Sequence, residues 1–211
     1  MFAVKERKYK ESIVDSFYTA NIDMPVIATI LAGPRFDELA TLAYNRLKPI
    51  EINSYEIDEA VFERQCFQLQ NLVSPEVAEI STLYLQDVNK CFVSNFMDID
   101  LMGTILTQGN TIRQLLEQQS ELLGTKVFIG TFSVRNSGGL ESTLNYIQNV
   151  IGLTLKSRVY IDKTQREKEH LGRAEYKHKF KTSTRGRIKD FIVYSYSDKE
   201  GPMVTFRIVY T

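Results

Sequence analysis

The side chains with the clearest chemical pattern lie late in the chain, where basic residues alternate with others. The spacing of the first three predicts that they share one face of a strand, because successive side chains of a strand point to opposite faces. A positive strand face with tyrosines nearby is typical of a surface that follows a phosphate backbone. Exposed lysines also protect edge strands from aggregation, which is the alternative role here. The basic residues concerned are Lys177, Lys179, Lys181, Arg185, Arg187 and Lys189.

Charge is distributed unevenly along a chain whose formal net charge is zero. Residues 1–100 carry 9 Lys and Arg against 16 Asp and Glu, whereas residues 101–211 carry 17 against 10. The stretch Lys156–Asp190 alone holds 12 basic and 5 acidic side chains. Such asymmetry indicates a polyanionic partner, complementary contacts between subunits, or a solvated basic face. Possible partners are therefore nucleic acid and other protein subunits.

The same asymmetry predicts the geometry of any self-association. A head-to-tail contact sets opposite potentials against each other, whereas a twofold contact through either region brings like charges together. We expect copies of this chain to meet with the basic region of one against an acidic helix of the next. The acidic residues of that helix are Asp58, Glu59 and Glu63.

Motifs for catalysis, cofactors or metals are not recognisable. His170 and His178 have no cysteine nearby, whereas a structural zinc site needs about four N or S ligands. Both histidines lie in the charged region, where we expect exposure rather than the burial that suits a catalytic base. A nucleophile elbow and a P-loop are absent as well, and Asn136–Gly139 reads as a plain loop. We therefore predict no catalytic residue, cofactor or metal.

The elements that would position these side chains differ between the two halves. In the first half, helical spacing and start signals occur after Pro34, at Asp58 and at Ser74-Pro75. Pro25–Ala32 fits either a buried strand or a helix end, and Val77–Phe96 is helical in pattern with a strand alternative. Met97–Gly109 resembles a crossover between the halves.

The second half contains more strands. Thr111–Leu123 and Leu140–Ile151 read as helices around a strand at Lys126–Val134. Further strands are predicted at Leu155–Ile161, Arg173–Thr182, Ile188–Tyr196 and Met203–Tyr210. The predicted class is α+β, with a helical N-terminal half and a mainly antiparallel β-sheet in the C-terminal half. We expect a mainly helical region over residues 1–100 and an α+β region with the basic ribbon over residues 101–211. The two regions form either separate units or one continuous domain.

Composition predicts a cytoplasmic protein with no membrane partner. No apolar run reaches the roughly 20 residues of a membrane helix, and no secretory signal follows the charged N-terminus. Cys66 and Cys91 are too few for a disulfide framework, and their apolar surroundings predict buried free thiols in a reducing compartment.

Two segments resemble the chorismate-lyase/UTRA class of small-ligand domains. They are Ile105–Val134 and the final YSYSDKEGPMVTFRIVYT, which in that class contribute a helix and closing strand to an antiparallel sheet around a pocket. The resemblance implies a small-ligand domain or a lyase. Arg207 stands at about the position of the catalytic Glu of the lyase, so the acid that this activity needs is missing.

With no catalytic signature, the leading prediction is a non-enzymatic structural subunit of a multi-chain assembly. The specific candidate is a virion component, such as a phage neck, tail or baseplate protein. The alternatives are a nucleic-acid-contacting module that uses residues 156–190, and the small-ligand domain or enzyme that the resemblance implies.

Overall fold

The structure, a computed structural model, describes residues 25–31, 39, 49–135, 137–166, 175–182, 187–198 and 201–211. The strands from β1 to β5, most of them from the first half of the chain, are parallel. β1 pairs with β2 and β4, β2 pairs with β3, and β4 pairs with β5, all in parallel. These strands are β1 (Ile27–Ile30), β2 (Glu51–Glu56), β3 (Ser81–Leu85), β4 (Phe96–Thr104) and β5 (Lys126–Ser133).

Helices connect these strands and begin at local start signals. Asp58 caps the first of them, because its side chain accepts a hydrogen bond of 3.0 Å from the Val61 N–H. Gly103, the last residue but one of β4, turns the chain toward the next helix with φ +111°, a conformation that favours glycine. The helices are α3 (Glu59–Asn71), α4 (Pro75–Glu79), the 3₁₀ turn η1 (Val88–Lys90), α5 (Ile105–Ser120) and α6 (Leu140–Thr154).

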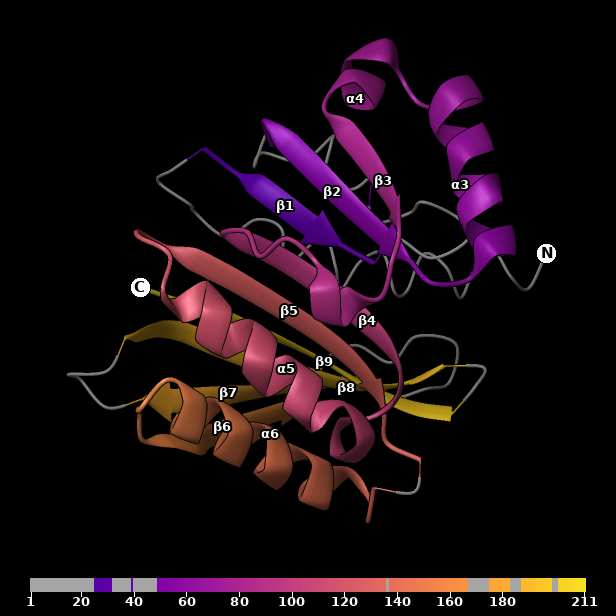
Figure 1. Cartoon of the computed structure of the whole chain (residues 1–211). Coiled ribbons are helices and arrows are strands. Elements are labelled where there is room, and N and C mark those ends of the chain that lie inside the picture. Colours follow the sequence, from indigo (N-terminus) through magenta and orange to yellow (C-terminus); the bar gives the residue numbers. More distant parts are fainter. Residues whose placement is uncertain are drawn as a thin grey trace.

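The C-terminal part of the chain extends the same sheet with antiparallel strands. β9 pairs with β5 on one side and with β8 on the other, and β8, β7 and β6 follow in antiparallel order. The result is one nine-stranded sheet in the order β3-β2-β1-β4-β5-β9-β8-β7-β6 (Figure 1). The added strands are β6 (Val159–Arg166), β7 (Tyr176–Thr182), β8 (Ile188–Asp198) and β9 (Gly201–Tyr210).

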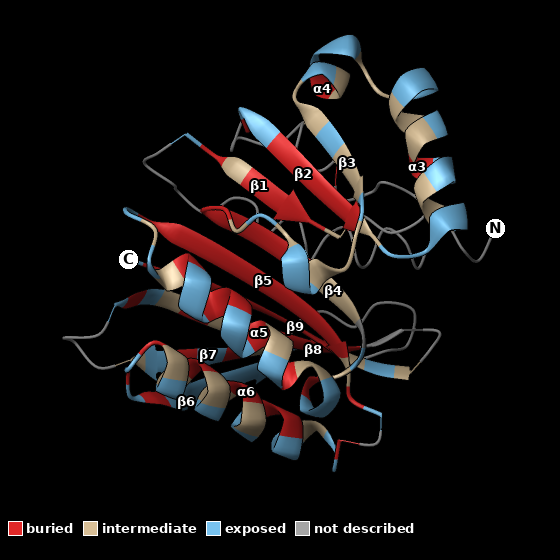
Figure 2. Cartoon of the chain, in the orientation of Figure 1, coloured by how far each residue is buried: buried red, intermediate tan, exposed pale blue. Residues whose placement is uncertain are grey.

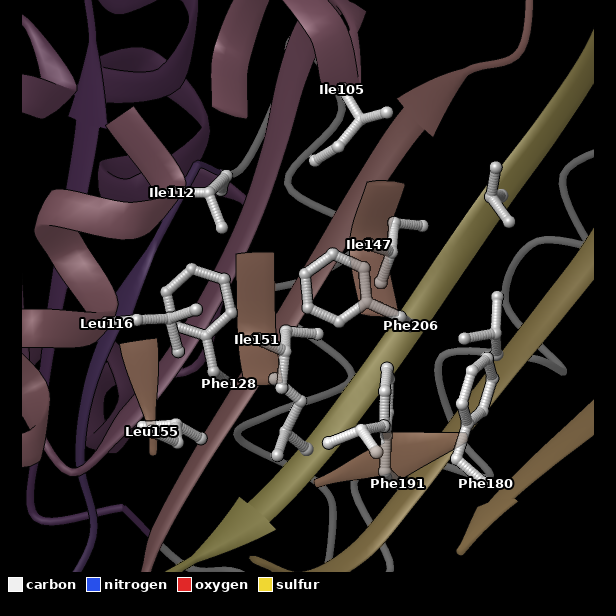
Figure 3. Packing of buried hydrophobic residues seen from close by; sticks show 14 of the residues in the cluster. Ile105, Ile112, Leu116, Phe128, Ile147, Ile151, Leu155, Phe180, Phe191 and Phe206 are labelled. Atoms are coloured by element: carbon white, nitrogen blue, oxygen red, sulfur yellow. The ribbon is translucent and has the colours of Figure 1, made fainter. Parts of the chain in front are cut away.

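Both faces of the sheet pack against a hydrophobic core. On one face, α5 and α6 lie next to each other and cover aromatic residues of β5, β8 and β9, including Phe128, Phe191 and Phe206 (Figure 3). On the other face, Ile52, Ile129 and the buried Leu39 belong to a second cluster. The central strand β5 is consequently buried along nearly its whole length (Figure 2).

The predicted fold class is wrong, because the N-terminal half is not mainly helical. It contributes β1, β2, β3 and most of β4 to a mixed sheet. β4 spans residue 100, where the two predicted regions meet, and it pairs with β1 and β5. Parallel strands that are buried on both faces have continuous apolar runs, and periodicity cannot separate such runs from buried helix.

Individual elements show where that ambiguity misled the prediction. Val77–Phe96 is helical in pattern with a strand alternative, and the structure has the strand β3 there, followed by η1. Met97–Gly109 was expected to be a crossover, and it forms β4 and the start of α5. The helix at Asp58, the strand at Lys126 and the four C-terminal strands are confirmed, with shifted ends. Among the described residues, no helix is long and apolar enough to cross a membrane.

Candidate functional site

The order of the parallel strands creates a switch point between β1 and β4. From β1 the chain adds β2 and β3 in one direction, and from β4 it adds β5 in the other. In open α/β sheets, ligands bind outside the carboxyl ends of the strands at such a point, because the connections diverge there. Ile30, the last residue of β1, lies beside Asp98, and the Leu31 N–H donates to the Asp98 carbonyl over 3.0 Å. The candidate site is therefore the carboxyl edge of β1, β2 and β4.

Glu56 is the carboxylate best placed at this edge. It is the last residue of β2, and its Oε1 accepts hydrogen bonds from the Ile57 N–H at 2.8 Å and the Asp58 N–H at 2.9 Å. These two donors hold the half-exposed carboxylate at the end of the strand. Within the described residues its Oε2 makes no hydrogen bond, which leaves an acceptor for a hydroxyl group of a ligand.

A second polar group lies close to the end of β1. Ser54 pairs with Ile30 in the sheet register, and Ser54 is 1% exposed. Among the residues that the structure describes, its Oγ has no hydrogen-bond partner. A buried hydroxyl without a partner is unfavourable, so this position beside the switch point suits a ligand or water that supplies one.

Two further carboxylates lie on β4 next to the switch point. Asp98 is 4% exposed and Asp100 is half-buried, and the alternation of the strand places both on the side of Phe96. Asp100 lies beside Thr131 of β5, whose hydroxyl is 3.0 Å from that of Thr205. Together with Glu56, these acids make the edge suited to a ligand that carries positive charge and hydroxyl groups.

Two apolar side chains lie at the same edge. Ile57, the residue after β2, is 70% exposed, and Leu85, the last residue of β3, is 48% exposed. Next to them in the two strands the rings of Tyr55 and Tyr84 stack at 4.8 Å, and the Tyr55 hydroxyl accepts a hydrogen bond from the Phe92 N–H. Burial raises the pKa of Tyr55 above its ordinary value, so this phenol stays neutral. The exposed apolar surface suits the flat ring of a heterocycle.

The structure separates the interaction residues that the sequence singled out. Lys179 is exposed, Lys177 lies 5.3 Å from the centre of the Tyr194 ring, and Lys181 forms an ion pair of 2.8 Å with Asp162. Lys189 and Arg187 lie toward the opposite end of the ribbon, and Lys189 donates to the Thr125 hydroxyl over 3.1 Å. Arg185 lies outside the described residues.

The predicted acidic partners are on the far side of the molecule. Asp58 is the N-cap of α3, and Glu59 and Glu63 are exposed on that helix. α3 packs near β3, one edge of the sheet, whereas β6 is the other edge. The acidic and basic groups therefore do not meet within one chain, and their contact between chains stays a prediction.

The sequence predicts an exposed His178, and this prediction is wrong. His178 is 4% exposed, its Nδ1 is 3.0 Å from the Thr164 hydroxyl, and its Nε2 is 2.9 Å from the Ser195 hydroxyl. The order Ser–His–Thr is geometrically similar to a hydrolase triad, but a threonine hydroxyl cannot stabilise an imidazolium as a carboxylate does. His170 lies outside the described residues, within which no group of three or more His, Cys, Asp or Glu is arranged to hold a metal.

Sequence reasoning missed Glu56 and the acids of β4. One signal for Glu56 was present: it follows Gly33 by 23 residues, and Gly33 comes shortly after β1. Nucleotide-binding α/β folds place a ribose-binding acid at about this spacing, at the end of the second strand. The signal required β1 and β2 to be identified as neighbouring parallel strands, which the helical interpretation of the first half prevented.

Several solved structures have a similar architecture. No protein-family model matches the chain, and no curated protein matches its sequence. A putative rRNA-methylase from Clostridium thermocellum superimposes with a TM-score of 0.52 at 11% identity, over 98% of this chain and 97% of that one. TYW2 from M. jannaschii, solved in complex with AdoMet, gives 0.53 at 10% identity, over 98% and 76%.

A third solved structure has a similar fold. Precorrin-6y C5,15-methyltransferase from Geobacter metallireducens gives a TM-score of 0.51 at 10% identity, over 94% of this chain and 86% of that one. At such identities the likeness concerns the fold. The segment Ile105–Val134, which resembles the chorismate-lyase/UTRA class, forms α5 and the parallel strand β5 instead of leading into an antiparallel sheet.

The prediction of a non-enzymatic structural subunit is therefore wrong, and with it the specific candidate of a phage neck, tail or baseplate protein. Two of these neighbours are named as a methylase and a methyltransferase and the third was solved with AdoMet, so the fold that they share with this chain is one found in enzymes, and incorporation into a virion has no support. The error arose because a switch point is a property of strand order, and no short motif marked it in the sequence. The chain has the Rossmann-like fold that methyltransferases use.

Proposed function

We propose that this chain is a methyltransferase that binds S-adenosylmethionine at the carboxyl ends of β1, β2 and β4. The observation that carries the proposal is the position of Glu56 at the end of β2, with one carboxylate oxygen held by two backbone N–H groups. The other oxygen is available to the ribose hydroxyls of the donor. S-adenosylmethionine supplies a methyl group activated by a sulfonium.

The residues of the edge fit this donor better than a dinucleotide. A dinucleotide needs several glycines in the first loop, because its pyrophosphate approaches the backbone closely, and this chain has only Gly33 between β1 and Asp37. S-adenosylmethionine contains no phosphate and carries a positive sulfonium. The carboxylates of Glu56, Asp98 and Asp100 give the edge the negative potential that attracts such a cation.

The remaining groups of the edge suit the other parts of the donor. The exposed side chains of Ile57 and Leu85 offer an apolar surface for the adenine ring. The buried Ser54 hydroxyl, beside Ile30, could form a hydrogen bond with a polar group of the donor. Cys66 and Cys91 are half-buried free thiols. Free thiols fit a reducing compartment, and a cytoplasmic location is part of the proposal.

Titration calorimetry on the full chain tests the proposal. We expect S-adenosylmethionine to bind, and Glu56→Ala to weaken binding by roughly tenfold to a hundredfold, the effect of losing a hydrogen bond to a charged group. Glu56→Gln keeps an acceptor for the Ile57 and Asp58 N–H groups but removes the charge, so its affinity should lie between the two.

Glu59→Ala is the matched control, because it removes a neighbouring exposed carboxylate that belongs to the first turn of α3 and not to the strand end. Its affinity should equal that of the parent. The proposal would be contradicted if the parent does not bind the donor at about 1 mM. At this concentration even a binding free energy of about −4 kcal/mol is detected. Equal losses in Glu56→Ala and Glu59→Ala would assign the effect to overall charge instead of to the strand end.

A further inference from the structure

Three lysines of the β6–β7 ribbon lie on one face, and within the described residues none of them has an anionic partner. Lys163 and Lys179 occupy directly opposite positions in the two strands, and Lys177 follows on the same face, two residues along β7. None of the three forms an ion pair among the described residues, and the Lys177 ammonium lies over the Tyr194 ring. Their neighbour Lys181, by contrast, is neutralised by Asp162.

The repulsion between the opposed Lys163 and Lys179 destabilises the pairing of β6 with β7 when no ligand is bound. Like charges directly across a pair of strands repel, because their Cβ atoms are only about 5 Å apart. Protection of an exposed edge does not explain the arrangement, since β7 is an inner strand and only β6 is the edge. A bound polyanion would relieve the repulsion.

An aromatic side chain shares this face. Tyr160 lies opposite Lys181 and is therefore on the same side as the lysines, and it is 51% exposed. Gln165, opposite Lys177, adds a neutral hydrogen-bonding group. Cations that track a backbone beside an exposed ring on which a base stacks are typical of surfaces that bind single-stranded nucleic acid. We call Tyr160, Lys163, Gln165, Lys177 and Lys179 the ribbon face.

The sheet register connects this face to the proposed donor site. Asp100 pairs with Thr131, Thr131 with Thr205, Thr205 with Tyr194, and Tyr194 with Lys177, one residue on each successive strand. Four strand spacings of about 4.8 Å separate Asp100 from Lys177 by roughly 19 Å. A small phosphorylated molecule cannot reach both ends of this row, whereas a chain of several nucleotides can.

We propose that the ribbon face binds the sugar–phosphate backbone of a single-stranded nucleic acid whose nearby nucleotide is the methyl acceptor. The identity of the acceptor rests on the function proposed above, whereas the binding of nucleic acid to the ribbon face is measured without the donor. The acidic strand ends then hold the cationic donor, and the ribbon holds the anionic acceptor about 19 Å away.

Fluorescence anisotropy with labelled single-stranded RNA and DNA of about 15 nucleotides tests this surface, since sites of this kind cover up to about 16 nucleotides. The test variant is the pair Lys163→Ala and Lys179→Ala in one chain. The control is the pair Arg64→Ala and Lys90→Ala, which removes the same charge from exposed positions on α3 and η1. Affinity is measured for parent, variant and control from about 50 to 200 mM salt.

We expect the parent and the control to bind alike. The slope of log K against log salt should be shallower by about 1.4 in the variant, because each contact with a single-strand phosphate contributes about 0.7. The thermal unfolding of the variant, recorded in parallel, separates a binding defect from a folding defect.

The inference is wrong if the parent binds neither nucleic acid at about 50 mM salt, where electrostatic binding is strong. It is also wrong if the control loses as much affinity as the variant, or if the parent binds phosphatidylserine vesicles and neither nucleic acid. Calorimetry with S-adenosylmethionine on the same proteins keeps the two proposals apart. If the parent binds S-adenosylmethionine but no nucleic acid, only the proposal for the ribbon face is wrong. If it binds nucleic acid but not S-adenosylmethionine, only the proposal of a methyltransferase is wrong.

Discussion

The imidazole of His178 is enclosed between the hydroxyl groups of Thr164 and Ser195. Burial lowers its pKa below the ordinary value of 6.5. The unfolded chain therefore takes up this proton as the pH falls below about 6.5, whereas the folded chain takes it up only at a lower pH. His178 thus contributes its full stability above 6.5, and the free energy of unfolding should decrease as the pH is lowered from there.

Urea denaturation between about pH 5 and 7.5, the window around the ordinary histidine pKa, measures this effect. His178→Gln removes the titrating group, so its stability should vary less with pH than that of the parent across the same window. His170→Gln leaves His178 in place and should keep the dependence on pH. A parent whose stability is constant from pH 7 to 5 would contradict the prediction.

Also at the scale of single residues, Glu56 shows how a local position acquires a role. In the sequence it is one of 26 acidic residues. At the end of β2 its carboxylate accepts hydrogen bonds from two backbone N–H groups and is held one strand away from the switch point between β1 and β4. The residue type alone says nothing of this, because the role depends on which strands lie beside β2.

At the scale of elements, α5 is the helix whose packing the sequence predicted best. Its apolar residues recur at helical spacing, which predicts that Leu115 or Leu116 faces the core. They are 1% and 0% exposed, and Figure 3 shows Leu116 in the core. Leu115→Ala or Leu116→Ala should each lower the free energy of unfolding by roughly 2–5 kcal/mol, because each leaves a cavity in the core between α5, α6 and the sheet.

Urea denaturation of both variants measures the loss, and Leu106→Ala on the same helix is the control. Leu106 is 45% exposed, so its truncation should have a much smaller effect. A loss below about 1 kcal/mol at both Leu115 and Leu116 would mean that the core face of α5 is misplaced.

The strands of the first half show the limit of pattern reading. β1 has the sequence IATI and β2 has EINSYE, and both are largely buried. Neither strand alternates between apolar and polar residues, because the sheet is covered on both faces. In β9, by comparison, the apolar alternation and the turn before it were sufficient to predict an antiparallel strand.

At the scale of the whole molecule, charge is separated along the sheet. The acidic α3 lies near one edge and the basic ribbon face at the other, eight strand spacings or about 38 Å apart. Head-to-tail association, which the sequence predicts, would join these ends in an open or cyclic stack. We expect sedimentation velocity to show association at low salt that weakens as salt is added.

Charge reversal tests this contact. Lys177→Glu with Lys179→Glu should abolish association, and mixing that variant with Glu59→Lys and Glu63→Lys should restore it between the two kinds of chain. Single-stranded RNA should compete with self-association, because both would use the ribbon face. A parent that sediments as a monomer at low salt, or associates through a twofold contact of two ribbons, would contradict the prediction.

The sequence by itself determined the elements whose patterns are local. The cap of α3 at Asp58, the core face of α5, the strand at Lys126 and the lysines on one side of β7 all follow from spacing over a few residues. Only the tertiary structure decided the order of the strands. That order places Glu56, Asp98 and Asp100 at one edge, although up to 44 residues separate them in the chain. Pairing between distant parallel strands depends on which buried faces fit together, and no short segment of sequence contains that information.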